Sequence, residues 1–223
     1  MKSKKLVALA LLAVISVGAG KAYAEISKNT ISKNKLMTEK VSIQVSDNKD
    51  KEDKLKEIVL KALEKYFNEK IDVNGSEEIV QLIKADVEWN SHGKDYYTIG
   101  WENGEKGWYC NIAEDGEIFE LGMDTGTDWK KVDLIDLEEA KKIAFDFVKE
   151  KKLIDNINEL EFLGEATIGP DTCGVVYKYG EDKGILISVD SGTKKVRGFT
   201  YKSESDARKC VENTDYRDSG TLG

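Results

Sequence analysis

Two short stretches of the chain have the residue pattern of an aspartic protease active site. DTGT begins at Asp124 and DSGT begins at Asp190. In that enzyme class each half of the molecule contributes one such Asp, and the two carboxylates share a proton. Asp124 and Asp190 are therefore candidate catalytic residues. Two cations, Lys194 and Lys195, directly follow the second stretch, however, and Asp, Ser, Thr and Gly are also ordinary turn residues.

A second candidate chemistry is that of a thiol hydrolase pairing Cys110 with His92, the single histidine. A thiolate nucleophile needs a nearby base and partial exposure. Cys110 alternates with Trp108 and Ile112, which indicates that its side chain faces a core. His92 lies in the polar stretch NSHGKD, where a loop is expected.

The sequence predicts no cofactor and no metal site. One His and three separated Cys do not supply the closely spaced ligands of a zinc site. The acidic residues lack the spacing of a calcium loop, and no glycine-rich phosphate loop follows a strand. Three cysteines allow at most one internal disulfide, for which Cys173 and Cys210, in polar surroundings, are the expected pair.

Residues 1–24 have the features of a signal peptide. Lysines precede an apolar run from Leu6 to Gly18, and Ala22-Tyr23-Ala24 fits the small-x-small pattern before a cleavage site. The run is shorter than the roughly 20 residues of a membrane span, although an N-terminal membrane anchor is the alternative. Because this segment holds four lysines and no acidic residue, its removal changes the net charge from −8 to −12. We expect a secreted or cell-wall-associated protein with no later membrane span, and no nucleic-acid partner.

Between polar ends, the chain begins with a helix and several strands. Residues 25–52 are predicted to be a polar linker, and residues 203–223 a polar tail that frays. Apolar residues recur at helical spacing from Asp53 to Glu69. Strand-like runs separated by turn signals follow at residues 79–89, 95–102, 107–113 and 117–121.

The same order then recurs. Asp136 is the expected N-cap of a second helix, with Glu139 three residues on. Strand-like runs follow at residues 159–167, 174–180, 184–190 and 195–201. The predicted fold is α+β with two tandem units, residues 53–122 and 136–202, joined by a linker at 123–135. Each unit is expected to pack one helix on its own antiparallel meander sheet.

The repeat allows the positions of Asp124 and Asp190 in the two units to be compared. Asp190 falls in the last hairpin of the second unit, whereas Asp124 falls in the linker. The two positions are not equivalent, so we interpret both stretches as turn or linker sequence.

Four aromatic residues alternate along the strands of the first unit: Trp89, Tyr97, Trp101 and Trp108. Such residues either form the core beneath the helix or line an exposed sheet face that binds a partner. The second unit is less aromatic at these places, so under the second interpretation the first unit would be the binding unit.

The hairpin ILISVDSGTKKVRGF, residues 185–199, resembles the closing strands of a PepSY domain, which commonly read V-D-A-K-T-G-K-V. The matching positions are Val189, Asp190, Thr193, Lys195 and Val196, whereas Gly192 and Lys194 depart from the pattern. The resemblance covers roughly residues 53 to 201, apart from the linker. It implies a cystatin-like α+β fold, export and a noncatalytic role, and it supplies no catalytic residues.

PepSY modules occur in propeptides of thermolysin-type metallopeptidases and in stand-alone exported proteins, where modulation of peptidases has been proposed. The resemblance, to tandem exported proteins of Gram-positive type, therefore implies a noncatalytic binding module with a protein partner. An extracellular or cell-wall peptidase, inhibited or modulated by this chain, is the expected partner. A structural protein of the cell envelope is one alternative. A hydrolase using Cys110 and His92, or Asp124 and Asp190, is another.

Overall fold

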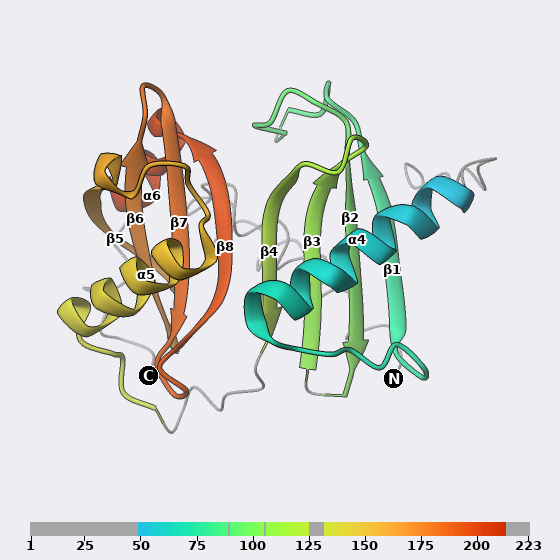
Figure 1. Cartoon of the computed structure of the whole chain (residues 1–223), viewed down its shortest axis with the longest axis horizontal. Coiled ribbons are helices and arrows are strands. Elements are labelled where there is room, and N and C mark those ends of the chain that lie inside the picture. Colours follow the sequence, from blue (N-terminus) through green and yellow to red (C-terminus); the bar gives the residue numbers. More distant parts are fainter. Residues whose placement is uncertain (1–48, 89, 105, 125–131, 213–223) are drawn as a thin grey trace, which may run out of the picture.

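The structure is a computed structural model that describes residues 49–88, 90–104, 106–124 and 132–212. The expected signal peptide and most of the expected N-terminal linker lie outside these residues. The elements of the first half are α4 (Lys49–Phe67), β1 (Glu77–Ile83), β2 (Tyr96–Asn103), β3 (Lys106–Ala113) and β4 (Ile118–Asp124). Those of the second half are α5 (Leu137–Lys151), a 3-10 turn (Ile157–Glu159), β5 (Glu161–Gly169), β6 (Thr172–Tyr179), β7 (Lys183–Asp190), β8 (Lys195–Ser203) and α6 (Glu204–Glu212) (Figure 1).

The strands form one eight-stranded antiparallel sheet in the order β1-β2-β3-β4-β8-β7-β6-β5. The α+β class is as the sequence predicts, but the two separate sheets expected from it are a single sheet. The last strands of the two meanders pair with each other, through Glu120 with Thr200, Leu121 with Phe199 and Gly122 with Gly198. The two meanders join because the edge of each one presents unpaired backbone N–H and C=O groups, and pairing β4 with β8 satisfies them.

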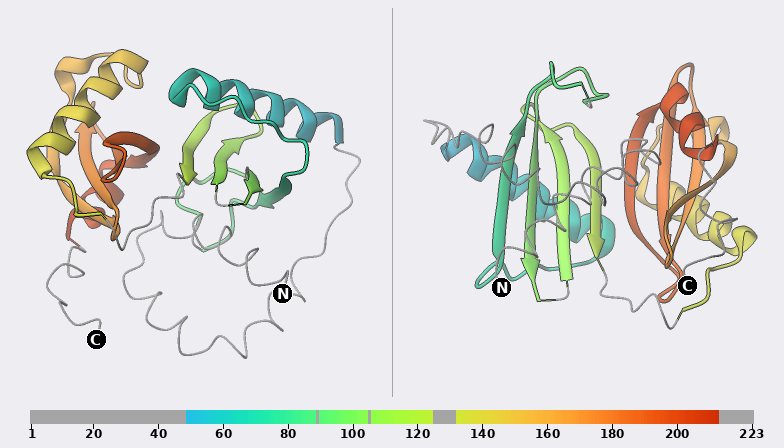
Figure 2. Two further views of the ribbon diagram at one scale, coloured as in Figure 1. Left: turned by 90° about the horizontal axis from the view of Figure 1, so that it is seen from below. Right: turned by 180° about the vertical axis from the view of Figure 1, so that it is seen from behind.

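Helices α4 and α5 lie on the same side of the sheet, and a shared core fills the space beneath them (Figure 2). The start of α5 is as predicted, because the Asp136 carboxylate accepts hydrogen bonds from the backbone N–H groups of Glu138 and Glu139 at 2.9 and 3.3 Å. Helix α4 begins at Lys49, four residues before the predicted start. Within the described part of the chain, no helix is long and apolar enough to cross a membrane.

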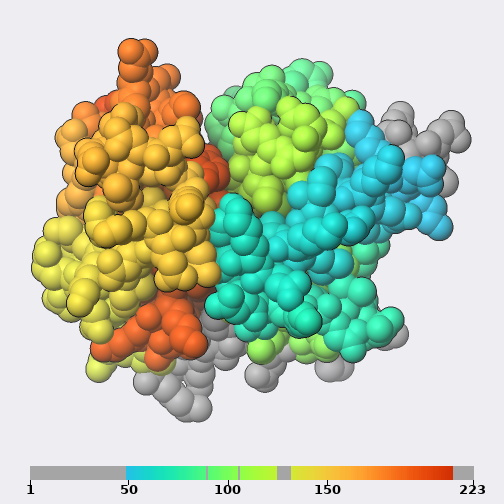
Figure 3. Space-filling view, viewed as in Figure 1, coloured from blue at the N-terminus to red at the C-terminus, as the bar shows by residue number. Residues whose placement is uncertain are grey.

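Phe199 of β8 connects the two halves of the molecule. Its ring contacts Tyr66 and Phe67 at the end of α4, with centroids 5.1 and 6.4 Å apart, and Phe147 of α5 at 6.4 Å. In the space-filling view the end of α4 lies against the second half (Figure 3). The halves therefore share aromatic packing as well as a sheet.

Helix α6 packs on the opposite face of the sheet, behind the second meander (Figure 2). Its buried Ala207 packs with Ala166, Val176 and Leu186. The frayed tail expected from Ser203 is therefore wrong for residues 204–212. The sequence signal for the start of α6 is Ser203, which caps this helix. Its Oγ accepts a hydrogen bond from the backbone N–H of Asp206 at 3.1 Å.

Candidate functional site

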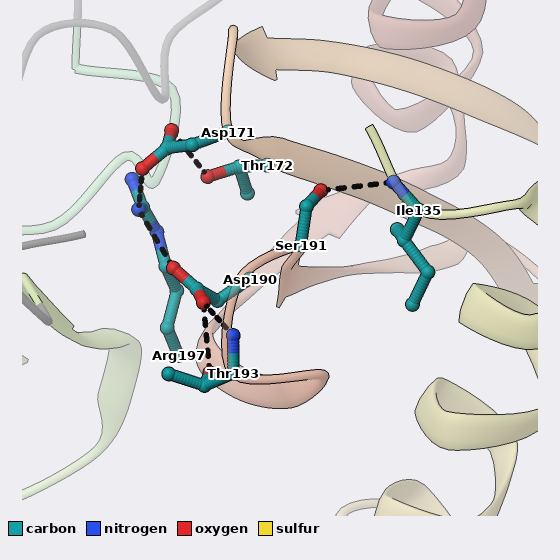
Figure 4. Close-up of polar contacts among 7 residues, drawn as sticks. All are labelled: Ile135, Asp171, Thr172, Asp190, Ser191, Thr193 and Arg197. Atoms are coloured by element: carbon teal, nitrogen blue, oxygen red, sulfur yellow. Dashed lines mark hydrogen bonds and ion pairs between the residues drawn. The ribbon is translucent and has the colours of Figure 1, made fainter. Parts of the chain in front are cut away.

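Asp190, from the DSGT stretch, closes the hairpin between β7 and β8 (Figure 4). Its side chain is fully buried, and its Oδ1 accepts hydrogen bonds from the Thr193 backbone N–H at 2.6 Å and the Thr193 hydroxyl at 2.8 Å. Lys194 has a left-handed backbone, with φ of 53°, and donates its N–H to the Asp190 carbonyl. The hairpin turn expected for DSGT is therefore present.

Arg197 lies beside two carboxylates at this end of the sheet (Figure 4). Its Nη1 atom is 3.0 Å from Asp171 Oδ2 and 3.7 Å from Asp190 Oδ2. Ser191 extends the cluster, because its N–H donates to the Asp171 carbonyl and its Oγ accepts from the Ile135 N–H at 3.1 Å. These contacts tie β6, β7, β8 and the segment before α5 together, which is a structural role for Asp190.

Asp124 is the last residue of β4, so the first meander extends two residues into the expected linker. The remainder of its DTGT stretch lies outside the described residues. The register places Gly107 of β3 opposite Asp124. Each Asp is thus the last residue of a strand, but Asp124 ends the fourth strand of the first meander rather than lying in the predicted linker, whereas Asp190 ends the third strand of the second meander. The two positions are not equivalent.

Cys110 and His92 are not brought together. Cys110 is fully buried in the core beneath the helices, and burial raises the pKa of its thiol. His92 stacks on Phe119, with ring centroids 4.1 Å apart, in a cluster on the other face of the sheet. Burial, and to a smaller extent the Lys202 cation, lowers the pKa of His92 from 6.5 to about 4.

The proposed aromatic binding face is not exposed at three of its four residues. Tyr97, Trp101 and Trp108 are 2%, 2% and 6% exposed, because they form the core of the first half with α4. Trp101 Nε1 also donates a hydrogen bond to Glu78 Oε1 at 3.1 Å. These rings are core residues, and the side chain of Trp89 lies outside the described residues.

The expected disulfide between Cys173 and Cys210 is not formed in this structure. Cys173 belongs to the core on the α5 side of the sheet, where its Sγ donates to Glu165 Oε1 at 3.2 Å. Cys210 lies on α6, which packs on the opposite face. The sheet therefore separates the two sulfur atoms.

A largely buried polar chain, for which the sequence pattern gives no signal, crosses the first meander. Thr98 Oγ1 donates to Asn111 Oδ1 at 2.8 Å, and Asn111 Nδ2 donates to Glu120 Oε2 at 2.7 Å. Burial and the Glu120 carboxylate raise the pKa of the neighbouring Tyr109. Satisfied buried polar groups of this kind fix the register of neighbouring strands. Among the described residues, no group of three His, Cys, Asp or Glu side chains could hold a metal ion.

The two outer edges of the sheet differ. β5 pairs with β6 through two register shifts, and its Gly164 lies beneath Val211 of α6. β1 pairs with β2 over seven residues without a shift, and in the described part of the chain β2 is its one strand neighbour. Bulges and covering elements block an edge against further pairing, whereas a regular strand can accept another. β1 is the candidate binding site of this structure.

The chain matches no family model and no curated protein. Among solved structures it is similar to the C-terminal domain of YpeB from Bacillus megaterium, with 16% sequence identity and a TM-score of 0.45. The match covers 74% of this chain and 64% of that chain, which is less than two thirds of its length.

Proposed function

We propose that this protein is an exported, noncatalytic binding module that takes up an extended segment of a protein partner at β1. The partner we propose is an extracellular or cell-wall peptidase, whose activity the bound module restrains. The observation that carries the binding role is the contrast between the regular β1 edge and the bulged β5 edge against which α6 packs. Export and the peptidase partner follow the sequence resemblance to PepSY modules.

An added strand would find hydrogen-bonding groups and side-chain contacts at β1. Every strand edge offers backbone N–H and C=O groups, which provide affinity when an extended peptide adds to the sheet. Val80 and Leu82 are partly buried against the core on the helix side, and Ile79 is partly exposed on the other face. Neighbouring apolar side chains on the partner strand would extend both faces of the sheet.

A noncatalytic role agrees with the environments of Asp190 and Cys110, two candidate catalytic residues. Asp190 is held by its own turn and lies near Arg197, while Cys110 is buried on the face of the sheet away from His92. A catalytic thiol needs partial exposure and a base within hydrogen-bond reach.

The proposal is tested by capture of partners from culture supernatant, followed by peptidase assays with the captured proteins. Ile79→Lys places a charge on the β1 edge, where lysine opposes strand addition. Val73→Lys is the matched control, since Val73 is 38% exposed and lies before β1. We expect Ile79→Lys to lose a captured peptidase that wild type and Val73→Lys retain. Capture of no peptidase, or equal capture by all three proteins, would contradict the proposal.

A further inference from the structure

Three carboxylates share one row across the strands of the first meander. The register pairs Glu77 of β1 with Glu102 of β2, Glu102 with Gly107 of β3, and Gly107 with Asp124 of β4. Residues directly opposite one another in a sheet point to the same face. We call Glu77, Glu102 and Asp124 the acidic row; Gly107 in its middle contributes no side chain.

The acidic row lies on the face of the sheet away from α4. The adjacent row contains Glu78, Trp101 and Trp108, and both tryptophans are buried in the core beneath α4. Successive side chains of a strand point to opposite faces, so Glu77 and Glu102 point away from the helix. The row begins at the open edge, because β1 is the outermost strand.

Glu77 and Glu102 are a like-charge pair, and neither forms an ion pair with a cation among the described residues. Like charges directly opposite each other on neighbouring strands are destabilising. Other carboxylates of the first half do form ion pairs, as Glu78 does with Lys56 at 2.7 Å and Asp95 with Lys84 at 2.7 Å. The first two positions of the acidic row therefore place two carboxylates with no ion pair among the described residues beside the edge where a partner would dock.

A strand added to β1 would continue the acidic row by one residue. The side chain facing Glu77 would stand about 5 Å from it, on the same face of the sheet. On the other face, the added residues opposite Val80 and Leu82 would lie beside side chains that pack against the core. The edge thus offers one acidic position and two apolar positions at a fixed spacing.

We infer that the segment bound at β1 has Lys or Arg at the position facing Glu77 and apolar residues at the positions facing Val80 and Leu82. This inference rests on the proposed function, because it takes β1 as the docking edge. For an antiparallel segment the order is apolar-x-apolar-x-x-basic, and for a parallel segment it is the reverse. The net charge of the chain, −8, also favours the approach of a basic segment.

The inference is tested with peptides of known sequence. The probes are Ser-Val-Ser-Val-Ser-Ser-Lys, its retro-sequence, and the same two peptides with Glu in place of Lys, all capped at both ends. Each is titrated into the 15N-labelled protein while backbone amide shifts are followed by NMR. At low salt we expect one lysine peptide to shift the amides of β1 and to bind more tightly than its glutamate counterpart, by about 1.4-fold to fivefold, the range of an exposed ion pair. High salt should reduce that ratio.

Variants that remove negative charges test whether Glu77 and Glu102 cause the preference for the lysine peptide. Glu77→Gln with Glu102→Gln should abolish the preference for lysine. The control, Asp146→Asn with Glu181→Gln, removes the same charge from two exposed residues that have no ion pair among the described residues. This control variant should retain the preference for the lysine peptide. Equal shifts of β1 by lysine and glutamate peptides would overturn this inference and leave strand docking intact. Peptides that leave β1 unshifted at millimolar concentration would overturn docking at this edge, and with it the proposed function.

Discussion

His92 shows how the surroundings of one side chain set its chemistry. The ring lies flat on Phe119 and meets the Tyr96 ring edge-on at 5.4 Å. The charged groups around it are Lys202 of β8, Glu117 before β4 and Asp206 of α6. Because the stacked ring is partly removed from water, its charged form is disfavoured, and the pKa of about 4 follows.

This shift predicts a loss of stability in mild acid. The unfolded chain binds a proton at His92 near pH 6.5, whereas the folded protein does so only near pH 4, so stability falls as the pH drops through this interval. The melting temperature should be lower at pH 5.5 than at pH 7.5, a range in which unperturbed carboxylates stay ionised. His92→Phe, which can still stack on Phe119, should reduce the difference. An NMR titration of the single histidine with a midpoint near 6.5 in the folded protein would contradict this account.

At the scale of elements, α6 depends on small residues beneath it. Gly184 of β7 faces Ala207, and a Cβ at Gly184 would overlap the Cβ of Ala207, which cannot rotate away. Gly184 therefore permits the close approach of α6 to the sheet.

Gly184→Ala should displace α6 and destabilise the protein by about 1–3 kcal/mol, as overpacking does. Gly169→Ala is the control, because a Cβ there would meet its nearest atom, Asp171 Oδ1, at an ordinary 3.4 Å. Urea unfolding measures the stability, and hydrogen exchange of the α6 amides reports the displacement. Equal effects of the two substitutions would show that close packing at Gly184 is not what holds α6.

The elements that the sequence predicts are those with a local signal. Asp136 and Glu139 mark the start of α5 before any tertiary contact is considered, and alternation marks the strands. The junction of β4 with β8 depends on three residue pairs distant in the chain, from Glu120 with Thr200 to Gly122 with Gly198. Strand order, and hence the open edge at β1, is not encoded in local periodicity. The acidic row could be found only after the register was known.

At the scale of the whole molecule, the two halves are expected to unfold together. They share the β4–β8 pairing and the aromatic contacts of Phe199, which is 2% exposed. Removing a large buried aromatic side chain typically costs about 3–5 kcal/mol. Phe199→Ala should lose that stability and also weaken the contact between α4 and the second half.

The positions of the tryptophans allow this coupling to be measured. Trp101 and Trp108 are buried in the core of the first half, so their fluorescence follows that half, whereas far-UV circular dichroism follows both halves. The two signals should coincide during unfolding of the wild type and separate in Phe199→Ala. Phe162→Ala, which removes a ring packed on Tyr177 within the second half, should leave the two signals together. Coincident transitions in Phe199→Ala would mean that the sheet junction alone couples the halves.

The difference between the two sheet edges also limits self-assembly. A sheet with one open edge can be extended only once. If two copies paired through β1, each would close the edge of the other, and the outer strands of the pair would be the two β5 strands. Because β5 is bulged and packed against α6, growth would stop at a dimer. The chain can thus keep a strand open for a partner without providing the second edge that polymerisation into a fibre requires.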